Sequence, residues 1–355
     1  MVAAFTYEAL PARVRFGSGT LACLPDELDR AGKSRALVLS TPQQRDQAER
    51  VAALIGPRAA GIFSDATMHT PVGVTRAALD AARSLDADCT VAVGGGSTTG
   101  LGKAVALRTG LMQFVVPTTY AGSEMTPILG QTEDGRKTTQ RDAAILPEVV
   151  IYDVDLTIGL PADLSATSGM NAIAHAVEAL YARDRNPIIS LMAEDAIRAL
   201  ARALPAIAAH PADPQARSDA LYGAFLCGCC LGAVGMALHH KLCHVIGGSF
   251  DLPHAQTHTI ILPHATAYNA AAEPEAMARI AAALGADDAA QGLYDLAGRI
   301  GAPRALRDLG MPEAAIDQAA REAVQNPYWN PRAIEPEPIR ALIARAWAGL
   351  PPLGA

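Results

Sequence analysis

The sequence predicts an α/β protein of two domains, a parallel-sheet domain at residues 1–157 and an all-helical domain at residues 158–355. Two observations lead to this fold class. The chain has 355 residues, which is about twice the usual length of one domain. Its first part alternates β-rich with helical segments, whereas its second part holds helical segments rich in Ala and Leu.

Five short runs in the first part are apolar throughout, a pattern that is typical of strands covered on both faces. Between some of them, at 43–56 and 70–87, apolar residues recur at helical spacing. Strands that alternate with helices form a parallel sheet with helices on both sides. The predicted strands are 34–41, 59–65, 88–96, 112–119 and 147–156.

From about residue 163 onward the sequence predicts helices only, and the domain boundary falls within 157–169. Proline lacks the backbone N–H that a helix interior uses, so we expect prolines to separate these helices. The predicted breaks are at Pro187, Pro205, Pro211, Pro253, Pro263, Pro303 and Pro331.

The charge pattern argues against two classes of partner. The net charge of −7 comes from 29 basic and 36 acidic residues without long runs of one sign. Nucleic acids and acidic membranes are bound by clustered positive charge, so we expect neither as a partner. No stretch reaches the roughly 20 apolar residues of a membrane-spanning helix. Glu8 leaves no room for a signal-peptide core, so secretion is not expected.

The cysteines predict a reducing compartment. A chain of this length does not need disulfides, and most of its cysteines have apolar neighbours, so we expect free thiols in a cytoplasmic protein. Cys227 and Cys230 form a C-x-x-C spacing, but no second pair accompanies them. We interpret both as core residues. The six cysteines are Cys23, Cys89, Cys227, Cys229, Cys230 and Cys243.

A glycine-rich loop follows the predicted strand 88–96. Glycines let a backbone approach a ligand closely, and the start of the next helix offers N–H groups to an anion such as phosphate. The loop lacks the G-x-G-x-x-G pattern because Thr99 replaces its last glycine, and it could also be a tight structural turn. A second polar loop, 117–126, follows the next strand. The candidate cofactor-binding residues are Gly94, Gly95, Gly96, Ser97, Thr98, Thr118 and Thr119.

Most of the histidines lie in the helical part. Asn171 and His175 are spaced i, i+4, as are His240 and His244, so each pair shares a helix face. His254 follows ten residues after His244. Such imidazoles could ligate a metal, act as acids or bind an anionic substrate, and a single one is often only a core residue. Spacing alone leaves these alternatives open.

Four motifs in order resemble the iron-containing alcohol dehydrogenase superfamily: GGGS at 94–97, PTTYAGSE at 117–124, NPI at 186–188, and H-x3-H-x9-H followed by LPH at 262–264. The resemblance implies a Rossmann-like dinucleotide-binding domain followed by a helical domain. It also implies a metal that is held by one aspartate and three histidines, with a further histidine close to the nicotinamide.

By this resemblance the family's histidine ligands correspond to His175, His240 and His254, and the further histidine corresponds to His244. Asn171 stands where the family has its aspartate. A neutral amide is a much weaker metal ligand than a carboxylate, so we expect no metal.

Asn171 and Gly100 differ from the residues that the alcohol dehydrogenases have at these positions. Together with the segments 5–17, 68–72 and 98–104, they resemble one branch of the superfamily, the maleylacetate reductases. That branch reduces the carbon–carbon double bond of maleylacetate to give 3-oxoadipate in bacterial degradation of aromatic compounds. The resemblance implies NADH or NADPH as the cofactor, a small dicarboxylate as the substrate and a homodimer. Thr41 stands where many NAD-specific members have an aspartate, so both cofactors are expected.

The candidate roles follow from this resemblance. His244 is the expected proton donor, and His175, His240 and His254 would bind the dianionic substrate and steady its enolate. Asn171, Lys241 and Arg332 are the further candidate substrate-binding residues. Lys241 and Arg332 would bind the carboxylates of the substrate, although either could be an ordinary surface residue. Two alternatives stay open: a metal-dependent alcohol or polyol dehydrogenase in which Asn171 is a ligand, and a non-catalytic nucleotide- or metal-binding protein.

Overall fold

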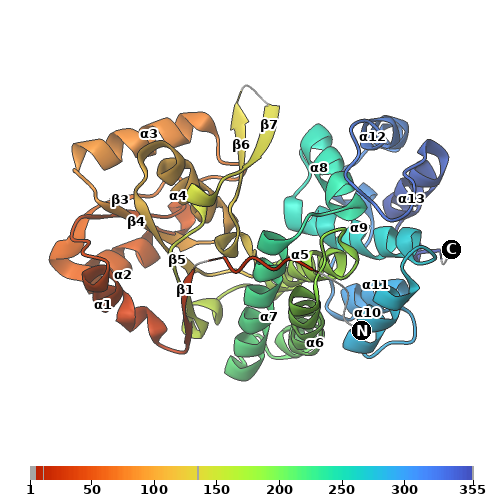
Figure 1. Cartoon of the computed structure of the whole chain (residues 1–355), viewed down its shortest axis with the longest axis horizontal. Coiled ribbons are helices and arrows are strands. Elements are labelled where there is room, and N and C mark those ends of the chain that lie inside the picture. The colour runs from red at the N-terminus through yellow and green to blue at the C-terminus, as the bar shows by residue number, and fades with distance from the viewer. Residues whose placement is uncertain (1–4, 11, 134–135, 354–355) are drawn as a thin grey trace. The chain divides into compact units, whose positions relative to one another are not determined.

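The computed structural model describes residues 5–10, 12–133 and 136–353, and it forms two compact units (Figure 1). Residues 9–160 make up the α/β unit. Residues 161–353, together with 5–8, make up the helical unit. The prediction of a parallel sheet followed by a helical part is confirmed.

The α/β unit is built on a six-stranded parallel sheet with the strand order β1-β8-β5-β4-β2-β3. The chain passes from β2 outward to β3, and later from β4 outward to β5 in the opposite direction. The direction of winding therefore changes between β2 and β4, and ligands of such sheets bind at the carboxyl ends of the strands beside this point. The strands are β1 Arg13–Gly17, β2 Ala36–Leu39, β3 Ala59–Phe63, β4 Cys89–Gly94, β5 Met112–Pro117 and β8 Val149–Asp153.

Helices cover both faces of this sheet because its strand residues are apolar on both sides. Ala36 and Val38 of β2 pack with α1 and α2, whereas Leu37 and Leu39 of the same strand pack with α3 and α4. This explains why the strands read as continuous apolar runs. The helices are α1 Leu24–Arg30, α2 Arg45–Ile55, α3 Val72–Ser84 and α4 Gly96–Thr109.

Two features of this unit lie outside the sequence predictions. β1 is an edge strand with partly exposed residues and two arginines, so it has no apolar run to reveal it. The hairpin of β6 Ile128–Glu133 and β7 Arg136–Arg141 forms a separate two-stranded antiparallel sheet. Its strands are rich in polar residues and lack the apolar runs from which the other strands were predicted.

The helical unit is arranged around α5, which is buried along most of its length. α5 packs against α6, α7 and α9, and α8, α9, α12 and α13 share a second apolar core. No strand occurs among the described residues of this unit. The helices are α5 Ala162–Tyr181, α6 Pro187–Ala209, α7 Pro214–Ala233, α8 Leu238–Phe250, α9 His254–Asn269, α10 Pro274–Leu284, α11 Ala289–Arg299, α12 Ala315–Ala323 and α13 Pro336–Ala348.

The expectation that every marked proline separates two helices is wrong for Pro205 and Pro263. Pro205 lies inside α6 and Pro263 lies inside α9. Both helices are packed into the unit on several sides, and such packing can outweigh the one hydrogen bond that a proline removes. Pro187 begins α6 directly after Asn186, whose side chain accepts from the Ile189 N–H, so the NPI motif is a helix start.

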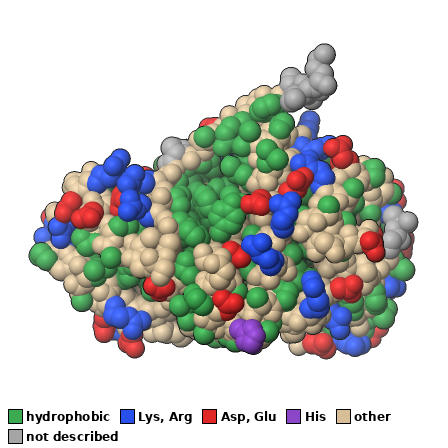
Figure 2. Space-filling model, turned by 90° about the horizontal axis from the view of Figure 1, so that it is seen from below, with side chains coloured by type: hydrophobic (Ala, Val, Ile, Leu, Met, Phe, Trp, Pro, Cys, Tyr) green, Lys and Arg blue, Asp and Glu red, His purple; other side chains and the backbone are tan. Residues whose placement is uncertain are grey.

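Cys227 and Cys230 are buried free thiols on α7, as expected for core residues, and burial raises the pKa of both. Among the described residues no single helix is long and apolar enough to cross a membrane, although the bent pair α7 and α8 meets that test by length and composition. On the face drawn in Figure 2, basic and acidic side chains are interspersed and histidine occupies very little of the surface.

Candidate active site

The glycine loop joins β4 to α4 at the carboxyl edge of the sheet. Gly94 has a φ of +150°, and its carbonyl accepts from the Thr118 N–H at 3.0 Å, which ties this loop to the end of β5. A side chain at Gly94 would place its Cβ 2.5 Å from the Thr98 Oγ1. The first turn of α4 contains no acidic residue, so its positive end can receive an anion.

Gln44 connects two further candidate cofactor residues, Thr41 and Thr118. Its Nε2 donates to the Thr118 Oγ1 at 2.8 Å, and its Oε1 accepts from the Thr41 hydroxyl at 3.4 Å. Thr41 follows β2, and Thr118 follows β5, so these contacts span the end of β4 between them. The structure thus brings the sequence-predicted cofactor residues together at the winding change of the sheet.

Buried Lys103 holds the second polar loop in place. From α4 its Nζ donates to the carbonyls of Ser123 and Ile128 at 2.5 and 2.9 Å, and to the Thr126 hydroxyl at 2.9 Å. Burial lowers the pKa of Lys103 to about 7, and the nearby Glu124 carboxylate opposes this shift. These contacts fix the loop after β5 to the helix that follows the glycine loop.

Gly100 leaves room for a neighbouring side chain. A Cβ at Gly100 would lie 2.5 Å from the Thr70 Oγ1, and Thr70 is buried with a φ of +44°. An aspartate at position 100 would require the Thr70 side chain to move. The motif at 68–72 and the departure at Gly100 therefore lie side by side.

The helical unit gathers most of its histidines where α5, α8 and α9 meet. α5 contributes His175, α8 contributes His240 and His244, and α9 contributes His254. The ring centroids of His175 and His240 are 5.0 Å apart, and those of His240 and His244 are 6.1 Å apart. His254 joins the cluster through His258, with centroids 4.2 Å apart.

A hydrogen-bonded chain runs through this cluster. The His175 Nδ1 lies 2.9 Å from the His240 Nε2, and the His240 Nδ1 lies 2.6 Å from the Glu178 Oε2. All three side chains are buried, and that of Glu178 is 0% exposed. Both ring nitrogens of His240 are therefore used within the protein.

The family's metal does not fit these residues as the structure places them. A metal ligand at position 240 would have to offer Nε2, which instead shares a hydrogen with His175. Asn171 is buried, and its Oδ1 has no hydrogen-bond partner in the structure. A neutral amide oxygen is a poor substitute for the carboxylate charge that a divalent cation requires.

A second set of metal-binding residue types lies beside the first. Ligand atoms of His239, Cys243 and His258 lie within 4.8 Å of one another, and all three residues are buried. The His239 Nε2 and the His258 Nδ1 are 3.0 Å apart, shorter than the roughly 3.3 Å between two nitrogens on tetrahedral zinc. Burial lowers the pKa of both histidines well below its usual value. We interpret the set as a neutral hydrogen-bonded group.

The loop between α12 and α13 supplies a contact to His244. The Tyr328 hydroxyl lies 3.0 Å from the His244 Nδ1, and the Lys241 Nζ lies 5.8 Å from the centroid of the Tyr328 ring. Burial raises the pKa of Tyr328, so its hydroxyl keeps its hydrogen. The Arg332 guanidinium donates to the Tyr268 carbonyl at 2.9 Å and stacks over the Tyr268 ring. These contacts favour a structural role for Arg332, which holds the loop in place, over a role in binding a substrate carboxylate.

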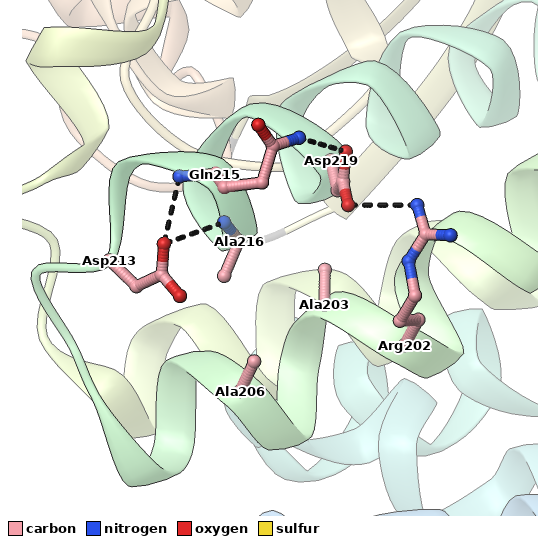
Figure 3. Close-up of a pocket in the computed structure, with 7 residues that line it drawn as sticks. All are labelled: Arg202, Ala203, Ala206, Asp213, Gln215, Ala216 and Asp219. Atoms are coloured by element: carbon pink, nitrogen blue, oxygen red, sulfur yellow. Dashed lines mark hydrogen bonds and ion pairs between the residues drawn. The ribbon is translucent and has the colours of Figure 1, made fainter.

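A depression of about 420 Å³ lies elsewhere in the helical unit, between α6 and α7 (Figure 3). Its polar side chains already have partners: Asp213 caps α7, and Arg202 pairs with Asp219 at 2.8 Å. None of the clustered histidines lines it. We assign it no role in the chemistry.

Sequence reasoning missed three residues that organise the site. Glu178 lies three residues after His175 and seven after Asn171, so helical spacing could have indicated it. Gln44 lies three residues after Thr41, and its amide gives no sequence pattern that marks it as part of the site. Tyr328 is distant in sequence from His244, and no local pattern connects the two.

Known proteins match nearly the whole chain. Residues 11–154 match the family described as iron-containing alcohol dehydrogenase, and residues 165–347 match the C-terminal part of the Fe-containing alcohol dehydrogenase family. Maleylacetate reductase from Sphingobium indicum is 60% identical over 351 residues, which make up 99% of each chain. Maleylacetate reductase from a Rhizobium species is 59% identical over 98% of this chain and 99% of its own.

The crystal structure of maleylacetate reductase from Agrobacterium tumefaciens has a TM-score of 0.96 at 58% identity, and covers 99% of this chain and 100% of its own. A parallel sheet with a glycine-rich loop at its winding change, followed by a helical unit with clustered histidines, is the arrangement of a class of oxidoreductases. Within that class, the chain belongs to the iron-containing alcohol dehydrogenase family.

Proposed function

We propose that this chain reduces the carbon–carbon double bond of maleylacetate to give 3-oxoadipate, with NADH or NADPH and without a metal. One observation supports this activity over the metal-dependent activity of other family members. Asn171 provides a neutral amide where a metal-binding carboxylate is expected, and the adjacent His175 and His240 are hydrogen-bonded to each other. An enone needs hydrogen-bond donors for its developing enolate, whereas a simple carbonyl needs a Lewis acid.

In this proposal the α/β unit holds the cofactor. The N–H groups at the start of α4 receive its pyrophosphate, and Gln44 and Lys103 keep the surrounding loops in place. The nicotinamide, when bound, supplies a hydride to the carbon β to the ketone. Because Thr41 carries no negative charge, it does not repel a 2′-phosphate, so we include both cofactors.

The helical unit provides the substrate-binding and proton-donating groups. In this proposal His244 acts as an imidazolium: its Nδ1–H faces the Tyr328 oxygen at 3.0 Å, and its Nε2–H is transferred to the substrate carbon, which leaves a neutral imidazole. His175 and His254 lie in the same cluster and would bind the dicarboxylate, with Lys241 as a candidate anchor. His175, whose Nδ1 is bonded to His240, would do so as an imidazolium through its Nε2–H.

Transfer of deuterium from NADH labelled at C4 tests this function. We expect the product to be 3-oxoadipate with deuterium on the carbon β to the ketone, detected by NMR. Deuterium on a carbinol carbon would instead identify a carbonyl reductase, the metal-dependent alternative. Absence of turnover with tight NADH binding would favour a non-catalytic protein. Light scattering on the same preparation tests the expected homodimer.

A further inference from the structure

Glu178 is a buried carboxylate with three donors around it. Its Oε1 accepts from the His239 N–H at 2.7 Å, and its Oε2 accepts from the Ala237 N–H at 2.8 Å. The His240 Nδ1 completes the set, 2.6 Å from Oε2. Both oxygens accept from backbone N–H groups, so we treat Glu178 as an acceptor only, and its contacts as charge-assisted hydrogen bonds.

Two of these donors lie at the start of α8, where Ala237 is the N-cap residue and His239 lies in the first turn. The backbone N–H groups at the start of a helix have no partner within the helix, and they carry the positive end of its dipole. No side chain of α8 itself caps this end. Glu178 of α5 therefore caps α8 from a neighbouring helix and fixes the backbone from which His240 projects.

The third donor fixes the ring of His240. Because Glu178 only accepts, the His240 Nδ1 must carry a hydrogen, and the neutral ring then offers Nε2 as an acceptor. The His175 Nδ1, 2.9 Å away, must therefore donate its hydrogen to the His240 Nε2. One carboxylate thus determines which nitrogen carries the hydrogen in two successive imidazoles.

We propose that Glu178 is a positioning residue of the reductase, which sets the tautomers and ring orientations of His240 and His175 through this hydrogen-bonded chain. Glu178 touches no reacting atom. Its contribution to catalysis rests on the proposed function, whereas its effect on the two rings does not.

Two variants separate this role from simple helix capping. Glu178→Gln can keep its oxygen toward Ala237 and His240, which satisfies two donors and leaves only the His239 N–H opposite an amide NH₂. Glu178→Leu removes every acceptor. Asp213→Ala is the matched control, because the Asp213 side chain accepts two backbone N–H groups at the start of α7 (Figure 3) and Asp213 is not part of the histidine cluster.

The measurements are the ¹⁵N shifts of the histidine rings in ¹⁵N-histidine-labelled protein, with His240 assigned from a His240→Asn variant, and steady-state kinetics with maleylacetate. We expect the Nδ1–H form of His240 in the unaltered protein and in Glu178→Gln, and its loss in Glu178→Leu. The kcat should fall about tenfold in Glu178→Gln and about 100-fold in Glu178→Leu, because the two rings lose their fixed positions. Asp213→Ala should lower Tm without changing kcat or the His240 shifts.

The inference is overturned if folded Glu178→Leu keeps both the Nδ1–H form of His240 and the original kcat, because Glu178 would then only cap α8. If Glu178→Leu does not fold, Glu178→Gln decides: a variant that loses the Nδ1–H form of His240 and yet keeps the original kcat overturns the inference, because the tautomer would then not matter to the reaction. An unaltered protein that fails to reduce maleylacetate, but shows the expected shifts, contradicts the proposed function and leaves the positioning of the two rings supported.

Discussion

The Gln44 side chain reaches across the end of β4 and donates to the Thr118 hydroxyl at 2.8 Å. Gly94, the last residue of β4, lies next to this contact, because a Cβ at Gly94 would be 2.7 Å from the Gln44 Oε1. The glycine loop is therefore a closely packed arrangement whose geometry depends on the missing side chain.

Gly94→Ala should weaken cofactor binding. The added methyl group would collide with Thr98 and Gln44, and the φ of +150° at this position is unfavourable for any residue with a Cβ. We expect the Kd for NADH, measured by fluorescence titration, to rise at least tenfold. Gly110→Ala is the control, because Gly110 ends the same helix with a φ of +70° and open space around it. An unchanged Kd in folded Gly94→Ala would mean that the loop is only a structural turn.

Tyr328→Phe should reduce the rate of proton donation. The change removes the hydroxyl that orients His244 while the ring still fills its place. We expect kcat to fall roughly tenfold with a smaller change in KM. Tyr294→Phe removes a comparable hydrogen bond, to the Gly349 carbonyl at 2.8 Å, and should affect stability alone. Equal kcat values for both variants would mean that the Tyr328 hydroxyl does not orient the acid.

His264 should make the protein sensitive to acid. Burial lowers the pKa of His264 to about 4, below its ordinary value of 6.5. The unfolded chain therefore binds more protons than the folded chain between these two values, so stability is complete above pH 6.5 and is lost as the pH falls toward 4. At pH 5 this amounts to about 2 kcal/mol.

His264→Gln cannot be protonated and should remove this part of the pH dependence. The test is the free energy of unfolding of both proteins at pH 7.5 and at pH 5. Replacement of exposed His210 by Gln is the control and should leave the difference between the two pH values unchanged. A His264→Gln variant with the full pH dependence would show that His264 is not the group responsible.

Asn171→Asp should weaken substrate binding. The two side chains are nearly equal in size, so a large effect must come from charge, and a buried carboxylate beside the histidines would repel a dicarboxylate. We expect KM for maleylacetate to rise about tenfold or more. Asn171→Ser removes the amide without adding charge, and it should raise KM less. Equal KM values for Asn171→Asp and the unaltered protein would mean that residue 171 does not face the substrate.

The strands β2, β3, β4, β5 and β8 could be predicted because burial on both faces leaves a local apolar signature. β1 and the β6–β7 hairpin could not, because β1 carries two arginines among partly exposed residues and the hairpin is polar, so both lack that signature. Pro205 and Pro263 misled the prediction, because packing outside the helix decides whether it tolerates proline.

Only part of the candidate site could be predicted from the sequence. Histidines spaced i, i+4 on one helix were visible in the sequence, and the structure places them in one cluster. The contacts of Glu178 with α8 and of Tyr328 with His244 join residues about 60 and 84 positions apart, so only the fold reveals them. These two contacts determine where hydrogens lie on the imidazoles, which spacing alone cannot give.

The central claim is that this chain reduces maleylacetate without a metal. The measurement is NADH oxidation with maleylacetate by protein dialysed against a chelator, beside elemental analysis of the same preparation. We expect the dialysed protein to contain far less than one metal ion per chain and to retain its full rate, because both ring nitrogens of His240 are already hydrogen-bonded and Asn171 carries no charge. Stoichiometric iron or zinc, with activity that is lost on its removal and restored on its return, would contradict the account.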